Sequence, residues 1–184
     1  MYEQKTNKEL KPGINDGTPL ADEFGLCTGS FLSDRIANLQ EIERRNQTQY
    51  PWNCFSAVQF VAASNTLPLL INHMPEFGQK TDIDIALSTL RRPFVFQIIG
   101  RYELPAEFNM GTEEFTGVIH SGIVLREDRN NSLIKIFEKN SWQGKLQTSA
   151  WHKVIQRFLG DIDYFRFFEA NDRQFQAWCK SYDQ

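Results

Sequence analysis

The sequence predicts a single α+β domain in which N-terminal helices pack on an antiparallel β-sheet. Apolar residues recur at helical spacing in the first half of the chain. After Pro93 the apolar runs become rich in aromatic and β-branched residues and are bounded by turn-forming residues, as is typical of strands. A chain of 184 residues, 41% of them hydrophobic, can bury one core and is short for two. We therefore expect one domain over residues 1–184.

The first half is expected to be helical after an irregular lead-in. Residues 1–30 are dense in Gly, Pro, Asn and Asp, which favour turns. The spacing of Ile36, Leu39 and Ile42 then predicts an amphipathic helix, and the apolar run that starts at Cys54 predicts a buried one. Helices are expected over residues 33–45, from residue 54 to about residue 65, and over residues 82–90.

The second half is expected to contain most of the sheet. Strands are predicted over residues 94–102, 115–125, 132–139 and 164–169, and helices over residues 151–159 and 171–181. The link over residues 126–131 is short and polar enough for a hairpin, whereas residues 105–114 have the length of a separate loop. Asn171 is the expected cap of the last helix.

Charge and hydropathy exclude some classes of partner. Twenty basic and 23 acidic residues give a net charge of -3, so no basic surface for nucleic acid is expected. No apolar run approaches the roughly 20 residues that cross a bilayer, so no membrane span is expected. Residues 1–11 lack the pattern of a secretory signal. The compartment stays open between the cytoplasm and export with a removed or non-classical signal, and the oligomeric state stays open as well.

The three cysteines point to a reactive thiol rather than to disulfides or a metal. Cys27, Cys54 and Cys179 are odd in number and widely spaced, so at least one should remain a thiol. The chain has no HExxH, EF-hand, P-loop or GxGxxG pattern, so no metal and no cofactor are expected. Cys54 is the candidate nucleophile because it starts a predicted helix, whose N-terminus favours a thiolate. Cys27 has no evident helix behind it, and Cys179 is expected to serve packing.

His120 is the candidate base for this thiol. It lies on a predicted strand and is followed by Ser121 and Gly122, whose small side chains leave room for a reacting group. By two-residue alternation, Glu138 and Asn140 share one face of the next strand, and either can orient the imidazole. A lone buried Cys or His is more often a packed core residue. The combination of the three side-chain types favours catalysis, whereas the remaining His73 and His152 are expected to be structural or exposed.

Three segments resemble the papain-like cysteine peptidases. Residues 53–58 (NCFSAV) look like the family's active-site helix, and residues 120–125 (HSGIVL) look like its histidine strand. Residues 139–142 (KNSW) are similar to its Lys-Asn-Ser-Trp-Gly motif. The order Cys, His, Asn also agrees. The short interval between Cys54 and His120 is closer to compact relatives, the NlpC/P60 cell-wall peptidases.

The resemblance implies a papain-like fold and a cysteine hydrolase that cleaves an amide or peptide bond through an acyl-enzyme. The implied substrate is a peptide or an amide, with cell-wall peptides as one class. Asn140 would orient His120, with Glu138 as its rival, because several compact relatives use another polar group there. The backbone N–H of Cys54 and the amide of Gln49 or Gln47 would hold the oxyanion. Here the chain departs from the family, since neither glutamine is an exact counterpart of the family's oxyanion-hole residue.

Two other functions remain open from the sequence. The same residues suit acyl transfer or deamidation, which differ from hydrolysis only in the acceptor. The chain could also be a catalytically inactive papain-like module that binds a peptide or a protein. The reactivity of the thiols separates the two classes, because only a live site predicts one cysteine that alkylates much faster than the others.

Overall fold

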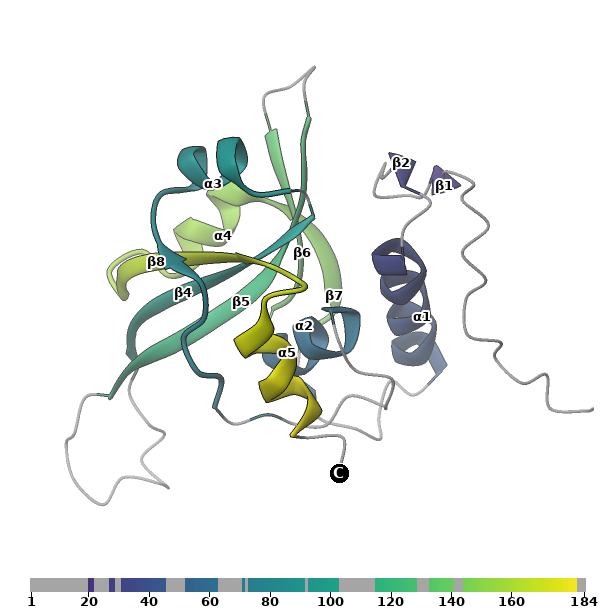
Figure 1. The fold of residues 1–184 in the computed structure, drawn as a ribbon, viewed down its shortest axis with the longest axis horizontal. Helices are drawn as coiled ribbons and strands as arrows, with labels where there is room; N and C mark the ends of the chain where they lie inside the picture. Colours follow the sequence, from purple (N-terminus) through teal and green to yellow (C-terminus); the bar gives the residue numbers. More distant parts are fainter. Residues whose placement is uncertain are drawn as a thin grey trace, which may run out of the picture.

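A computed structural model of the chain describes residues 20–21, 27–28, 31–45, 52–62, 71, 73–91, 93–102, 115–128, 133–140 and 144–181. Its main feature is a six-stranded sheet in the order β3-β8-β4-β5-β6-β7, with helices on both sides (Figure 1). Every strand pair described is antiparallel. The expected α+β class is therefore confirmed.

The helices are short apart from the first. They are α1 (Phe31–Arg45), α2 (Cys54–Ala62), α3 (Ile83–Thr89), α4 (Trp151–Arg157) and α5 (Arg173–Lys180). The strands of the large sheet are β3 (Gln79–Lys80), β4 (Phe94–Tyr102), β5 (Phe115–Asp128), β6 (Leu133–Lys139), β7 (Leu146–Ala150) and β8 (Ile162–Glu169). Two further strands, β1 (Leu20–Ala21) and β2 (Cys27–Thr28), pair only with each other.

Alternation along the strands divides the core into two clusters, one on each face of the sheet. On β4, Val95 contributes to the cluster that holds α1, α2 and α5, whereas Phe94 and Phe96 contribute to the cluster that holds α3 and α4. Figure 1 shows α2 and α5 on the side of the sheet opposite α3 and α4. The sheet is therefore a middle layer, and both of its faces are apolar because both are covered.

Most elements agree with the expectations from the sequence. The helix expected over residues 33–45 begins two residues earlier, at Phe31, and the strand expected over 115–125 continues to Asp128. The last strand begins at Ile162 rather than at residue 164. The last helix is capped by Asp172, whose carboxylate accepts bonds from the backbone of Gln174 and Phe175, so the expectation of Asn171 as the cap was wrong.

Four strands were missed, namely β1, β2, β3 and β7. β3 is only two residues long and pairs with β8 at one edge of the sheet. β1 and β2 fall in the expected lead-in over residues 1–30, which is therefore not irregular throughout. β7, at one edge of the sheet, has the sequence LQTSA, with one buried apolar residue and no alternation to mark it. The expected loop over residues 105–114 lies outside the described residues, as does the end of the helix expected near residue 65. No helix in the part of the chain that the structure describes is long and apolar enough to cross a membrane.

Candidate active site

Cys54 is the first residue of α2, directly after the residue that caps this helix. The side-chain oxygen of Asn53 accepts bonds from the backbone N–H of Ser56 at 3.1 Å and from its hydroxyl at 3.2 Å. The amide nitrogen of Asn53 donates to the carbonyl of Ile71 at 2.6 Å and so fixes the cap to a distant segment. The thiol of Cys54, which is 6% exposed and not part of a disulfide, is thus held at the positive end of a helix.

A buried ion pair fixes the segment that leads into α2. Lys139 of β6 lies 3.0 Å from a carboxylate oxygen of Glu43 on α1 and also donates to the carbonyl of Gly144. The second oxygen of Glu43 accepts from the backbone N–H of Leu146 at 3.0 Å. The ammonium group of Lys139 stands 5.1 Å from the ring centre of Trp52, two residues before Cys54. The ion pair therefore joins α1, β6 and the approach to Cys54.

His120 lies on β5 opposite Ile98 of β4 and is 2% exposed. Its ring stacks on Phe158 with a centroid distance of 4.9 Å and an interplanar angle of 26°. The ring of Phe96 lies 5.9 Å away at a tilted angle. Two aromatic side chains therefore restrict the orientation of the imidazole.

The small residues after His120 serve packing rather than an open site. A Cβ atom on Gly122 would lie 2.6 Å from a ring carbon of Phe96 and 2.8 Å from the carbonyl oxygen of Phe137. The hydroxyl of Ser121 donates to the carbonyl of Phe96 at 2.7 Å. The expected room beside Gly122 is thus occupied by Phe96, which explains why no larger side chain fits there.

Glu138 of β6 is the carboxylate that contacts His120. Its Oε2 lies 2.7 Å from Nε2 of the imidazole, and the two side chains are 0% and 3% exposed. Its Oε1 accepts a bond from the amide of Gln147 on β7 at 3.2 Å and another from the guanidinium of Arg157 on α4. Both oxygens of this buried carboxylate are therefore engaged, and only one of them faces the histidine.

The electrostatics favour the charged forms of both partners. Burial alone would lower the pKa of His120, but the charge and hydrogen bond of Cys54, together with those of Glu138, raise it from 6.5 to about 9. Burial alone would raise the pKa of Glu138, but its bonds to His120, Ser149 and Arg157 and the charge of His120 lower it from 4.5 to about 2. At neutral pH the pair is an imidazolium and a carboxylate.

Cys54 completes a continuous set of interacting groups. Its thiol acts on His120 both as a hydrogen-bond partner and through charge. Because Nε2 of the imidazole faces Glu138, Nδ1 is the ring nitrogen that remains for the thiol. The structure thus brings together three of the residues singled out from the sequence, namely Cys54, His120 and Glu138. Such a set can form a thiolate–imidazolium pair and move a proton between sulfur and nitrogen.

The other expected members of the site stand apart. Asn140 follows the end of β6 and is exposed, so the bond to Nε2 is made by Glu138 rather than by the first-choice orienter. Gln49 and Gln47, the expected oxyanion donors, lie outside the described residues, as does the side chain of Cys27. Cys179 is buried on α5, as expected for packing, and its carbonyl accepts from the amide of Gln59 at 3.3 Å.

Sequence reasoning missed two side chains that contact the pair, namely Arg157 at the end of α4 and Phe158, which follows it. The helix was predicted, but nothing in its own pattern says that its end packs over β5 and β6. His73 and His152 are exposed. The described residues contain no group of three or more His, Cys, Asp or Glu side chains that could hold a metal ion.

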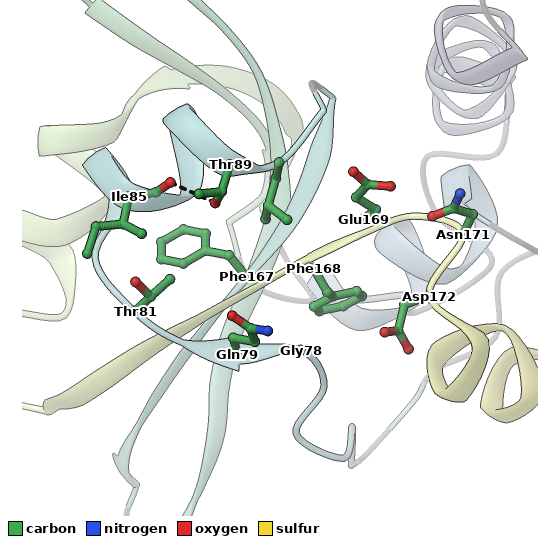
Figure 2. A pocket seen from close by; sticks show the side chains of 11 residues that line it. Gly78, Gln79, Thr81, Ile85, Thr89, Phe167, Phe168, Glu169, Asn171 and Asp172 are labelled. Atoms are coloured by element: carbon green, nitrogen blue, oxygen red, sulfur yellow. Dashed lines mark hydrogen bonds between the residues drawn. The ribbon is translucent and has the colours of Figure 1, made fainter.

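A separate pocket lies between α3 and β8 (Figure 2). It has a volume of about 410 Å³, and its walls include Ile85 and Thr89 of α3 and Phe167 and Glu169 of β8. No candidate residue lines it, so this pocket is not the space around Cys54.

Comparison with known proteins adds no assignment. The chain matches no protein-family model, no curated protein and no solved structure.

Proposed function

We propose that the chain is a cysteine hydrolase of papain-like type that cleaves an amide or peptide bond. The proposal depends above all on one observation: a thiol at a helix start, a buried histidine and a buried carboxylate interact in series. Placing an ionised carboxylate in a protein interior is costly unless charged partners offset the cost. Strongly shifted pKa values, such as those of His120 and Glu138, cluster at functional sites.

In the proposed reaction, the sulfur of Cys54 attacks the carbonyl carbon while its proton resides on His120. The tetrahedral oxyanion is stabilised by the backbone N–H of Cys54, which at a helix start has no acceptor within the helix. His120 then protonates the departing amine, the C–N bond breaks, and a thioester remains on Cys54. A water molecule that loses its proton to His120 attacks the thioester, which releases a carboxylic acid and regenerates the thiol.

Glu138 has a supporting role in this cycle. Its pKa of about 2 keeps it ionised throughout, so it orients the ring and stabilises the imidazolium without taking the proton itself. The proposed substrates are peptides and simple amides, including cell-wall stem peptides, on the basis of the resemblance to compact NlpC/P60 enzymes. Acyl transfer and deamidation would use the same residues with a different acceptor or a side-chain amide.

Burial of the site favours a second candidate function. Cys54 is 6% exposed and His120 is 2% exposed, so little of either side chain is open to solvent. A papain-like module that binds a peptide or protein without cleaving it needs no access to the sulfur. The two candidates differ in turnover, and they share the same fold.

The test is turnover of purified cell-wall stem peptides and a mixed peptide library in water enriched in ¹⁸O, followed by mass spectrometry. Hydrolysis predicts one ¹⁸O atom in the new carboxylate, whereas acyl transfer to an added amine predicts a new amide without ¹⁸O. Activity should be lost in Cys54→Ser and His120→Gln and should persist in Cys179→Ser as the matched control. Failure of the wild-type protein to cleave any substrate, with binding of one of them retained, would support the binding module.

A further inference from the structure

The end of α4 contacts both members of the histidine–carboxylate pair through consecutive residues. Arg157 donates a hydrogen bond to Oε1 of Glu138, and Phe158 stacks on the ring of His120 at 4.9 Å. The guanidinium carbon of Arg157 also lies 5.9 Å from the ring centre of Phe158. One short stretch of chain therefore restrains the carboxylate and the imidazole together.

We propose that Arg157 is a positioning residue that sets the charge state and the direction of the Glu138–His120 pair. The positioning role of Arg157 is argued from its contacts alone. Only the effect of Arg157 on catalysis rests on the proposed hydrolase function. Arginine suits this task because its guanidinium stays protonated at all relevant pH values and binds carboxylates directionally.

The geometry of Glu138 supports this role. The carboxylate side chain is 0% exposed, and its two oxygens have different partners. Oε2 faces His120, and Oε1 faces Arg157 and Gln147. Without the bonds to Oε1 the carboxylate could rotate, and Oε2 would no longer be held toward the imidazole.

The titratable groups of the site come from four elements. The members of the pair lie on β5 and β6, the thiol of Cys54 lies on α2, and the guanidinium of Arg157 lies on α4. In the proposed reaction His120 is neutral in part of the cycle. Glu138 would then be a buried anion beside a neutral histidine. Among the described residues, Arg157 is the cation that contacts this carboxylate.

The position of Arg157 is itself fixed by the fold. On α4, Val154 is fully buried. The turn that follows is closed by a bond from Phe158 N–H to the carbonyl of Ile155 at 3.1 Å and by one from Asp161 N–H to the carbonyl of Phe158 at 2.9 Å. The carbonyl of Asp161 in turn accepts from the backbone of Arg101 at 3.0 Å, which ties the turn to β4. Arg157 therefore lies at the end of a helix whose following turn is bonded to β4, and its side chain is 26% exposed.

A positive charge next to Glu138 makes it easier for His120 to release its proton. Loss of that positive charge should leave the negative charge of Glu138 less compensated. His120 should then hold its proton more tightly. Arg157→Gln should therefore raise the pKa of His120 above about 9, by roughly one unit. Arg157→Lys should keep the value near that of the wild type because it keeps the charge.

A purely structural role for Arg157 predicts the opposite sign. If the side chain only fastens α4, its loss would admit water to the pair, and the pKa of His120 would fall toward 6.5. The sign of the shift thus separates positioning from simple packing. Arg166→Gln is a matched control, since Arg166 is 27% exposed and bonds to Glu76 at 2.6 Å and to the carbonyl of Gly78 rather than to the pair.

The experiment is a titration of the three histidines by ¹H–¹⁵N NMR in the full chain, with His120 assigned from its loss in His120→Gln. A rise of the His120 pKa in Arg157→Gln, with near-wild-type values in Arg157→Lys and Arg166→Gln, would support the proposal. So would a smaller rise when Arg157→Gln is added to Glu138→Gln, measured from the pKa of the Glu138→Gln single variant. A fall or no change in folded Arg157→Gln would overturn it.

The outcome can be read even if Arg157→Gln does not fold. In the wild-type protein, the guanidinium N–H groups of Arg157 should exchange with solvent and rotate more slowly than those of Arg44, whose side chain is 70% exposed, and equal behaviour would contradict the proposal. None of these measurements requires turnover. A wild-type protein without activity would therefore refute the proposed hydrolase while leaving the assignment of Arg157 to be judged by the titration.

Discussion

At the scale of residues, the pair formed by His120 and Glu138 determines the chemistry of the site. A hydrogen bond of 2.7 Å between fully buried charged groups is strong only if both groups keep their charge. Cys54 supports the charge on His120 from the other side of the ring. The two neighbours therefore stabilise the charged imidazole, and removal of Cys54 or Glu138 should change the titration of His120.

Replacement of Glu138 by Gln should lower the pKa of His120, because the ring loses its anionic partner. We expect a fall of about one unit or more from the value of about 9. Asn140→Ala is the matched control, since Asn140 is exposed and the bond to Nε2 comes from Glu138. NMR titration of His120 in each of the two variants measures the change in its pKa. A fall in Asn140→Ala together with no change in Glu138→Gln would restore Asn140 as the orienter.

The sequence singled out Cys54 and His120, which the structure brings together, but could not separate the two candidate orienters. Cys54 was found from its place at a helix start and His120 from its place on a strand, which are local properties. Glu138 and Asn140 share a face only while the strand continues, and β6 ends at Lys139. Arg157 was not found because its contact depends on how α4 packs against the sheet.

At the scale of elements, the Lys139–Glu43 ion pair should contribute strongly to stability. Its side chains are 4% and 18% exposed, so loss of one partner leaves a largely buried charge. Lys139→Met should reduce the free energy of unfolding by about 3 kcal/mol. Urea unfolding monitored by circular dichroism measures this change.

The control for this prediction is Arg44→Gln. Arg44 is 70% exposed in its pair with Glu41, and its loss should change the free energy of unfolding by less than about 1 kcal/mol. Equal small effects in Lys139→Met and Arg44→Gln would mean that the buried pair does not anchor α1 and the segment before Cys54.

Elements with regular apolar patterns were predictable, and those formed by tertiary pairing were not. The helix spacing of Ile36 and Leu39 and the aromatic and β-branched runs of β4 and β5 gave the right classes. β7 carries a mostly polar sequence and exists because it pairs with β6 along the sheet edge. Its register opposite β6 places Gln147 beside Glu138, so the missed strand also supplies part of the site.

At the scale of the whole molecule, the site joins the three layers of the fold. Cys54 belongs to the core that contains α1, α2 and α5, whereas Phe158 packs against the core that contains α3 and α4. His120 and Glu138 lie in the sheet between them. The site therefore exists only in the complete fold, and its charges should be coupled to global stability.

This coupling predicts a stability maximum at mildly acidic pH. The lowered pKa of Glu138 contributes about 3 kcal/mol that is present above 4.5 and is lost as the pH falls toward about 2. The raised pKa of His120 contributes stability that is complete below 6.5 and is lost as the pH rises through about 9. Unfolding by urea across this range should show both losses. His120→Gln should flatten the alkaline side, and an unchanged profile in that variant would contradict the coupling.

The most direct test of the central claim is the pH dependence of alkylation by iodoacetamide, with each cysteine mapped by mass spectrometry. A thiolate–imidazolium pair predicts that Cys54 is labelled below pH 7 faster than Cys27 and Cys179, and that His120→Gln abolishes this difference. Slow and equal labelling of all three cysteines, unchanged by His120→Gln, would contradict the account and leave Cys54 as a packed residue of the core.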